Sequence, residues 1–174
     1  MWLKLNLDGI KLYFNIKGYR KSSNSNWDDE WCGVELNVLS ENWLNYSQSG
    51  EILLACEVEE TLSLFEDLVE DRILEPREIE FIEPDFKFVL NPKKNLMQDS
   101  RYIYVRPGHE NVDIDAELKV SFWNGYLTAN YLSLCLARED ILDFITYLKV
   151  ITNQISETDE HVQVLLKKGT LLKY

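Results

Sequence analysis

The sequence predicts an α+β domain in which an antiparallel β-sheet packs against two main amphipathic helices. Short segments in which apolar and polar residues alternate, as they do in strands, occupy both halves of the chain. In each half a longer segment follows, with apolar residues at helical spacing. Runs of strands followed by packed helices are typical of an antiparallel sheet that helices cover on one face.

The first half begins with strand-like alternation. Leu3, Leu5 and Leu7 alternate with polar residues, and Asp8-Gly9 then forms a typical two-residue hairpin turn. Residues 19–30 are polar and rich in Ser and Asn, which predicts a long loop between strands. The strands expected in this half cover residues 3–7, 10–16, 34–38 and 52–56.

The first helix is expected from residue 57 to residue 71. Val58, Leu62 and Phe65 recur at helical spacing and form an apolar stripe. Acidic residues occupy the first turn, where negative charge suits the helix dipole. Further acidic residues, Glu66, Asp67, Glu70 and Asp71, are expected on the solvent face of this helix.

The second half repeats this order. Pro76 and Pro84 interrupt the chain, and Asn124-Gly125 predicts a hairpin turn. A second helix is expected from 139 to 155, because Ile141, Phe144 and Leu148 recur at helical spacing. The expected strands are residues 81–82, 86–90, 102–105, 112–123 and 126–136.

A shift of 79 residues places Cys56 on Cys135 and Phe65 on Phe144. This similarity is explained either by a divergent duplication, with two pseudo-repeated β-rich halves, or by two amphipathic helices that share a period. Residues 1–156 are expected to form a single domain. Residues 157–174 are a C-terminal extension, for which a terminal hairpin is one expectation.

Acidic residues outnumber basic ones, 30 to 18, so the formal net charge is −12. This charge repels phosphate backbones and anionic lipids and attracts basic proteins, so neither nucleic acid nor a membrane is an expected partner. Solubility alone can also require such an excess. However, residues 57–85 contain 12 acidic and 2 basic side chains, a net of −10, and the remainder carries only −2. This concentration favours an acidic binding surface.

Three widely spaced cysteines, Cys32, Cys56 and Cys135, lie in apolar surroundings and lack zinc-ligand spacing. We therefore expect buried thiols in a reducing compartment. The N-terminus alternates like a strand and does not resemble a signal peptide. No apolar run approaches the ~18 residues of a membrane span. The sequence therefore predicts a soluble cytoplasmic protein.

Motifs for catalysis or cofactor binding are sparse. The chain has no glycine-rich phosphate loop, no Gly-x-Ser-x-Gly elbow and no His-Glu-x-x-His. Asp113 and Asp115 share one face of an expected strand and are residue types that hold divalent cations. A solvated acidic strand face is the simpler interpretation of this pair. We therefore predict no catalytic residue, no metal and no cofactor.

The tryptophans fall into two groups. Trp2, Trp31, Trp43 and Trp123 lie on or beside expected strands, where packing in the core is the commoner role. Trp27 lies instead in the polar 19–30 loop beside acidic residues, as is typical of an interface hot spot. The predicted partner-binding residues come from this loop and from the acidic helix: Trp27, Asp28, Asp29, Glu30, Glu66, Asp67, Glu70 and Asp71.

The segment Phe81-Ile82-Glu83-Pro84-Asp85-Phe86-Lys87-Phe88 is similar to a Phe-Leu-Glu-Pro-Asn-Leu-x-Phe signature of the WapI-type immunity proteins. The passage 53–60, and Gly18-Tyr19 with the polar loop and the strand after it, resemble that family in the same order. The resemblance covers most of residues 8–155. Asp85-Phe86 departs from the Asn-Leu of the signature, and Glu83-Pro84 is also a sequence suited to the start of a strand.

The resemblance implies a small bacterial protein, encoded beside a contact-dependent toxin, that sequesters this toxin in the cytoplasm of the producing cell. It implies no role for individual residues. Together with the charge, it predicts a non-catalytic protein that occludes a basic toxin surface. One alternative is a hydrolase or carbohydrate-binding domain that uses carboxylates and aromatic residues. Another is a general interaction protein, and the oligomeric state is left open.

Overall fold

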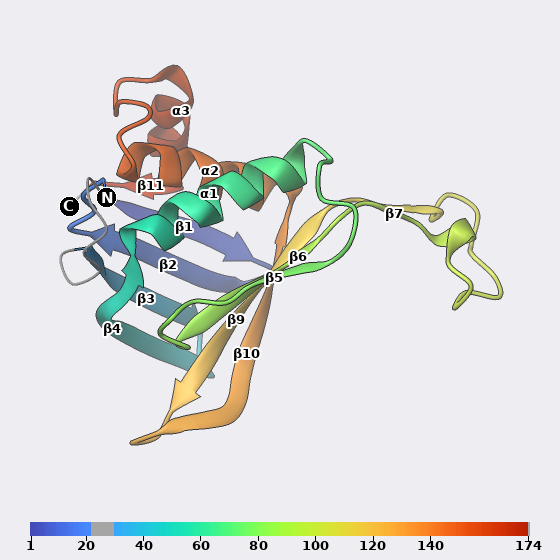
Figure 1. The fold of residues 1–174 in the computed structure, drawn as a ribbon, viewed down its shortest axis with the longest axis horizontal. Coiled ribbons are helices and arrows are strands. Elements are labelled where there is room, and N and C mark those ends of the chain that lie inside the picture. The colour runs from blue at the N-terminus through green and yellow to red at the C-terminus, as the bar shows by residue number, and fades with distance from the viewer. Residues whose placement is uncertain (22–29, 174) are drawn as a thin grey trace.

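The computed structural model describes residues 1–21 and 30–173, and its two sheets and its helices confirm the predicted α+β fold (Figure 1). The first sheet has the strand order β11-β1-β2-β3-β4, and the second has the order β10-β9-β6-β5. All of their strand pairs are antiparallel. The first sheet consists of β1 (Trp2–Leu7), β2 (Ile10–Lys17), β3 (Trp31–Ser40), β4 (Leu44–Leu54) and β11 (Leu171–Leu172). The second sheet consists of β5 (Arg77–Ile79), β6 (Phe86–Asn91), β9 (Asp115–Trp123) and β10 (Leu127–Ala137).

The helices lie together on one side of the sheets, as Figure 1 shows. They are α1 (Ala55–Val69), α2 (Arg138–Ile151) and α3 (Glu160–Lys168). A third, two-stranded sheet of β7 (Lys94–Asn95) and β8 (Asn111–Val112) lies in a segment that projects from the body. Among the described residues, no helix combines the length and apolar character needed to cross a membrane.

The two halves of the chain share one architecture. In each half, four antiparallel strands follow one another in sequence order across the sheet and lead into a helix. Both helices begin with the same cap: the Leu54 N–H donates to Glu57 Oε2 at 2.8 Å, and the Ala137 N–H donates to Asp140 Oδ2 at 3.0 Å. The projecting segment interrupts only the second half, between β6 and β9.

The register of 79 residues between the halves is wrong by about one helical turn. The equivalent cap residues are Leu54 and Ala137, which lie 83 positions apart. Cys56 lies in the first turn of α1, whereas Cys135 lies in β10. A shift of four residues keeps the same face of an amphipathic helix, so the apolar stripe alone does not distinguish the two registers.

Aromatic side chains from both sheets and both long helices meet in the core. Phe144 of α2 lies 5.3 Å from Phe14 of β2, 5.5 Å from Phe65 of α1 and 5.6 Å from Phe88 of β6, measured between ring centroids. All four rings are at most 1% exposed. Most of these contacts are edge-to-face, an arrangement that aromatic rings favour. The halves therefore share one core.

A buried hydrogen bond also joins the first sheet to α2. The last residue pair between β2 and β1 is Phe14 with Leu3, so Ile16 lies beyond the reach of β1. The Ile16 N–H donates instead to the hydroxyl of Tyr147 at 2.7 Å. A buried backbone N–H without a partner is costly. The Tyr147 hydroxyl therefore provides the hydrogen-bond acceptor that a neighbouring strand would otherwise supply.

Several segments differ from the expected secondary structure. Residues 81–82 were expected to form a strand but lie between β5 and β6, and β4 begins at Leu44, before the expected strand 52–56. Residues 102–105 were expected to form a strand, but they lie in the projecting segment without regular structure. The expected terminal hairpin is also wrong, because α3 occupies 160–168 and ends at Gly169 with φ of 74°. β11 then pairs with β1 at Leu3 and Trp2. The C-terminal residues therefore complete the edge of the first sheet.

The predicted burial of several side chains is wrong. Trp43 and Trp123 are 69% and 45% exposed, because they lie at the ends of hairpins that extend past the core. Cys56 and Cys135 are exposed, and only Cys32 is buried. Burial, followed by the proximity of Cys56 and Glu57, raises the pKa of the Cys32 thiol to about 11.

Replacing Tyr147 with Phe tests the bond between the first sheet and α2. We expect Tyr147→Phe to lower the free energy of unfolding by roughly 1–3 kcal/mol, because the buried Ile16 N–H loses its acceptor. Urea denaturation measures this loss. Tyr104→Phe, at an exposed tyrosine, is the matched control and should change stability little. Equal effects of the two variants would contradict this role of the Tyr147 hydroxyl.

Candidate functional site

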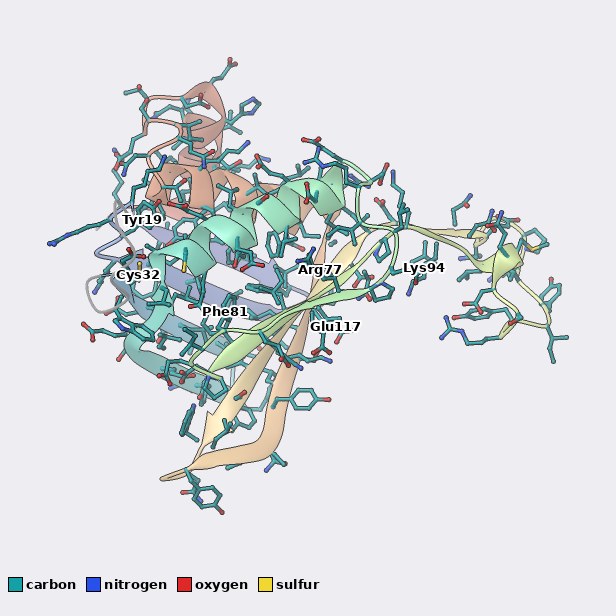
Figure 2. All side chains as sticks on the ribbon, in the orientation of Figure 1. Tyr19, Cys32, Arg77, Phe81, Lys94 and Glu117 are labelled. Atoms are coloured by element: carbon teal, nitrogen blue, oxygen red, sulfur yellow. The ribbon has the colours of Figure 1, made fainter. Side chains whose placement is uncertain are left out.

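The two ends of the predicted binding loop lie beside the start of α1 (Figure 2). The Tyr19 hydroxyl donates to Glu59 Oε1 at 2.5 Å, and the Ala55 N–H donates to the Glu30 carbonyl at 2.9 Å. Burial and the bond to Glu59 raise the pKa of Tyr19. Of the loop residues predicted to bind a partner, Glu30 is described, and Trp27, Asp28 and Asp29 lie outside the described residues.

The four predicted carboxylates of the helix lie at its other end. Asp67 accepts hydrogen bonds from the Arg72 guanidinium at 2.5 and 2.6 Å, and Glu70 also forms an ion pair with Arg72. Asp67 and Glu70 remain 32% and 59% exposed at their side chains. Because these pairs face solvent, they stabilise the fold little and leave the carboxylates accessible.

Two cations from outside the acidic segment also reach this end of α1. Glu66 pairs with Lys149 of α2 at 2.7 Å, and this ion pair joins the two long helices. Asp71 pairs with Lys93 at 2.8 Å, at the root of the projecting segment. Tertiary folding therefore offsets part of the negative charge that the sequence concentrates between residues 57 and 85.

Glu30, the described residue of the predicted binding loop, lies apart from the predicted carboxylates of the helix. The loop is anchored at Ala55 and Glu59, whereas Asp67 and Glu70 lie about ten residues further along the chain. At 1.5 Å of rise per residue, this separation amounts to roughly 15 Å along the helix axis. A partner that contacts both Glu30 and Asp67 must therefore extend along most of the length of α1.

Other acidic residues of the 57–85 segment have structural partners. Besides capping α1, Glu57 accepts a hydrogen bond from the Ile82 N–H at 2.8 Å. Glu78 and Glu80 lie beside β6 and accept hydrogen bonds from Lys87 at 2.6 and 3.2 Å. The acidic segment is thus divided between α1 and the second sheet and does not form one face.

The segment 81–88, which carries the family resemblance, joins the two sheets. Phe81 packs against Phe86 and Phe88, with ring centroids 5.1 and 6.3 Å away. Asp85 is 8% exposed and accepts a hydrogen bond from Gln48 of β4, and its carbonyl accepts from the Ser121 N–H of β9 at 2.8 Å. These contacts give the segment a structural role.

Burial raises the pKa of the Asp85 carboxyl above its usual value and outweighs a hydrogen bond from Trp123 that acts in the opposite direction. An ionised carboxylate is therefore held in a place that disfavours its charge. The signature that segment 81–88 resembles has Asn at this position, and a neutral amide does not incur this penalty.

The outward face of the second sheet contains two hollows. The first, of about 410 Å³, has both apolar and charged walls and is lined by Glu80, Phe81, Pro84, Phe86, Lys87, Lys119, Ser121, Leu127 and Tyr131. The second, of about 560 Å³, lies at the root of the projecting segment and is lined by Asn91, Pro92, Lys94, Val112, Asp115, Glu117, Ser133 and Cys135. Figure 2 labels Phe81, Lys94 and Glu117 at these places.

The carboxylates considered for a divalent cation have other partners. Asp113 accepts two hydrogen bonds from Arg138 at 2.7 and 2.9 Å, and this guanidinium lowers the pKa of Asp113 to about 2. Asp115 accepts a hydrogen bond from the Asn91 amide at 2.7 Å. In the described part of the chain, no three acidic, histidine or cysteine residues are grouped so as to hold a metal ion.

Comparison with known protein families matches residues 3–156 to the family described as the Immunity protein WapI-like family. The matched span contains both halves of the fold, the projecting segment and segment 81–88. Of the described elements, α3 and β11 lie beyond it. No curated protein sequence matches the chain significantly.

Replacing Asp85 with Asn tests the penalty for the buried charge. Since the pKa of Asp85 is higher in the folded state, the wild type loses stability as pH rises past the ordinary value of 3.8 and through the folded pKa. Asp85→Asn lacks this loss, so its stability relative to the wild type should rise from acid to neutral pH. Urea unfolding over that pH range measures the trend.

Asp99→Asn is the control for this experiment. Arg101 lowers the pKa of Asp99 to about 2, so the Asp99 variant should lose stability relative to the wild type as pH rises. Two variants with parallel pH profiles would show that Asp85 is not the source of the effect.

Proposed function

Since the chain belongs to the WapI-like immunity protein family, we propose that it neutralises a cognate bacterial toxin by binding it, without catalysing a reaction. The observation that carries this proposal is the family match over residues 3–156. The protein acts in the cytoplasm of the cell that produces the toxin. It does so as a stoichiometric inhibitor that covers the toxin's active surface.

The toxin surface that this protein covers is basic. The net charge of −12 favours such a partner, and the exposed carboxylates of Asp67 and Glu70 offer it local contacts. The predicted loop residues Trp27, Asp28, Asp29 and Glu30 supply a second contact. Toxin domains that cleave or modify nucleic acids need basic clefts, to which an acidic inhibitor is complementary.

Co-purification with the toxin encoded beside the gene tests the proposed function itself. We expect a stoichiometric complex whose association weakens as salt increases, because attraction between opposite charges is screened. Binding measured by calorimetry at low and high salt gives the slope. Failure to bind this toxin at any salt concentration would reject the neutralising role.

Reversal of two charges tests the helix surface. Asp67→Lys/Glu70→Lys should weaken toxin binding by roughly tenfold or more, a loss of about 1.4 kcal/mol or more. The fold should persist, because cations near the C-terminus of a helix are favourable. Glu66 and Asp71 are left unchanged, since Lys149 and Lys93 depend on them.

The matched control is Glu41→Lys/Glu51→Lys, which makes the same change in net charge at exposed residues outside α1. It should weaken binding much less. Equal losses in both variants would indicate long-range attraction instead of contact at α1. If the helix variant binds like the wild type while co-purification succeeds, the toxin contacts another surface.

A further inference from the structure

One side of β10 forms an open edge of the second sheet. β10 is the last strand in the order β10-β9-β6-β5, and Figure 1 shows it on the outside of that sheet. A regular ladder joins residues 131–137 to residues 115–121 of β9, and a bulge interrupts the ladder before residue 131. In the described part of the chain, β9 is the only strand that pairs with β10. The other side of β10 therefore has no neighbouring strand there.

The alternation of the backbone decides which groups of β10 point to this open side. The Ala137 N–H donates to a carboxylate at the start of α2 at 3.0 Å and not to β9. Because N–H and C=O groups reverse direction at each residue of an antiparallel strand, those of Tyr131, Ser133 and Cys135 point the same way as those of Ala137. β9 agrees, since the Ser121 N–H opposite Tyr131 donates at 2.8 Å to the carbonyl of the residue before β6. Three residues thus present N–H and C=O groups that no other described segment bonds.

This edge lacks the features that usually protect an open strand. Residues 131–136, Tyr-Leu-Ser-Leu-Cys-Leu, contain no charged residue, no Pro and no Gly. At the other edges of the two main sheets, β5 and β11 have only three and two residues, and β4 contains Gly50 and Glu51. Long uncharged edges are templates for pairing with another chain. Tyr131 is also 57% exposed, so an added strand would cover apolar surface.

Carboxylates near this edge indicate the charge of the strand that fits it. Burial raises the pKa of the Cys135 thiol, and so do the charges of four nearby carboxylates, Asp115, Glu117, Asp140 and Asp8. Lys119 lies 3.6 Å from Glu117, and Lys94 lines the second hollow together with Cys135, so two cations offset only part of this negative charge. A strand with Lys or Arg side chains is therefore complementary to the edge. A second copy of this chain would bring the same carboxylates together and be repelled.

The edge also continues from the helix surface proposed to bind the toxin. Arg138 directly follows β10, and Asp113 and then Asp71 raise the pKa of its guanidinium. Asp71 lies just beyond the end of α1, next to Glu70. Figure 1 likewise shows the end of β10 close to that end of α1. One partner can therefore contact the exposed carboxylates of α1 and the edge of β10 together.

We propose that the toxin supplies an extended segment with basic side chains, which adds to the second sheet as a strand beside β10. Its backbone bonds the N–H and C=O groups of Tyr131, Ser133 and Cys135. Its Lys or Arg side chains lie toward Asp115 and Glu117, where the second hollow, of about 560 Å³, gives them room. This inference rests on the proposed function and adds the mode of recognition to it.

Hydrogen exchange measured by mass spectrometry, on the full chain alone and in its complex with the toxin encoded beside the gene, tests the added strand. Amides of residues 131–135 should exchange roughly tenfold or more slowly in the complex, because those at the open edge acquire acceptors. β4, the outer strand of the first sheet, is the internal control and should exchange equally in both states. Unchanged exchange at 131–135 in a stable complex would overturn the inference and leave the proposed function intact.

Replacing Ser133 with Pro removes one donor from the edge. The Ser133 N–H points away from β9, so Pro at this position takes no hydrogen bond from the sheet. Ser133→Pro should weaken toxin binding by roughly tenfold or more. Ser133→Ala is the matched control: it also loses the hydroxyl bond to Glu117 but keeps the N–H, and it should bind like the wild type. Equal binding by two folded variants would contradict strand addition, and if circular dichroism shows the Pro variant unfolded, hydrogen exchange of the wild type decides.

The basic character of the segment is tested by removing two carboxylates near the edge. Asp8→Asn/Glu117→Gln should weaken toxin binding several-fold and reduce its dependence on salt. Glu41→Gln/Glu51→Gln, with the same change in net charge at exposed residues outside the edge, should have a much smaller effect. Equal effects of the two double variants would show that these carboxylates do not select the strand.

Two further results would overturn this inference. Exchange at residues 131–135 that slows in the free chain as its concentration rises would assign the edge to a second copy. If the toxin forms no complex at all, the added strand is rejected together with the proposed function.

Discussion

The fold depends on the aromatic contact between its two halves. Phe14 comes from the first sheet, Phe88 from the second, and Phe65 and Phe144 come from the two long helices. A four-stranded meander with one helix leaves part of its apolar face uncovered, and here each half covers the other. Tyr147 and the Glu66–Lys149 pair reinforce the same junction. The repeated architecture therefore results in one core.

Because the shared core occupies the interior, the outward surfaces are available for binding. The acidic residues of 57–85 have different roles. Glu57 caps α1 and Asp85 joins the sheets. Asp67 and Glu70 face solvent. Segment 81–88, which carries the resemblance in sequence, is held by structural contacts. The surfaces that select a partner are expected to vary more freely, because no core packing constrains them.

Most elements of the fold could be predicted from local pattern. The alternation at β1, β2, β3, β6 and β9 and the apolar stripes of α1 and α2 report directly which face is buried. Trp43 and Trp123 could not be placed this way, since a strand pattern does not show where the strand passes the edge of the core. The C-terminal residues were missed because β11 is a strand of two residues that only β1 makes possible.

The sequence by itself determined the α+β class, the two long helices, the excess of negative charge and the family. Local spacing and composition determine these properties, and both can be read from the sequence without knowledge of long-range contacts. Only the tertiary structure decided which carboxylates are paired, because Lys93 and Lys149 reach α1 from distant parts of the chain. It alone separated the start of α1 from Asp67 and Glu70 and placed β10 at the outer edge of its sheet, since exposure depends on what packs against a residue.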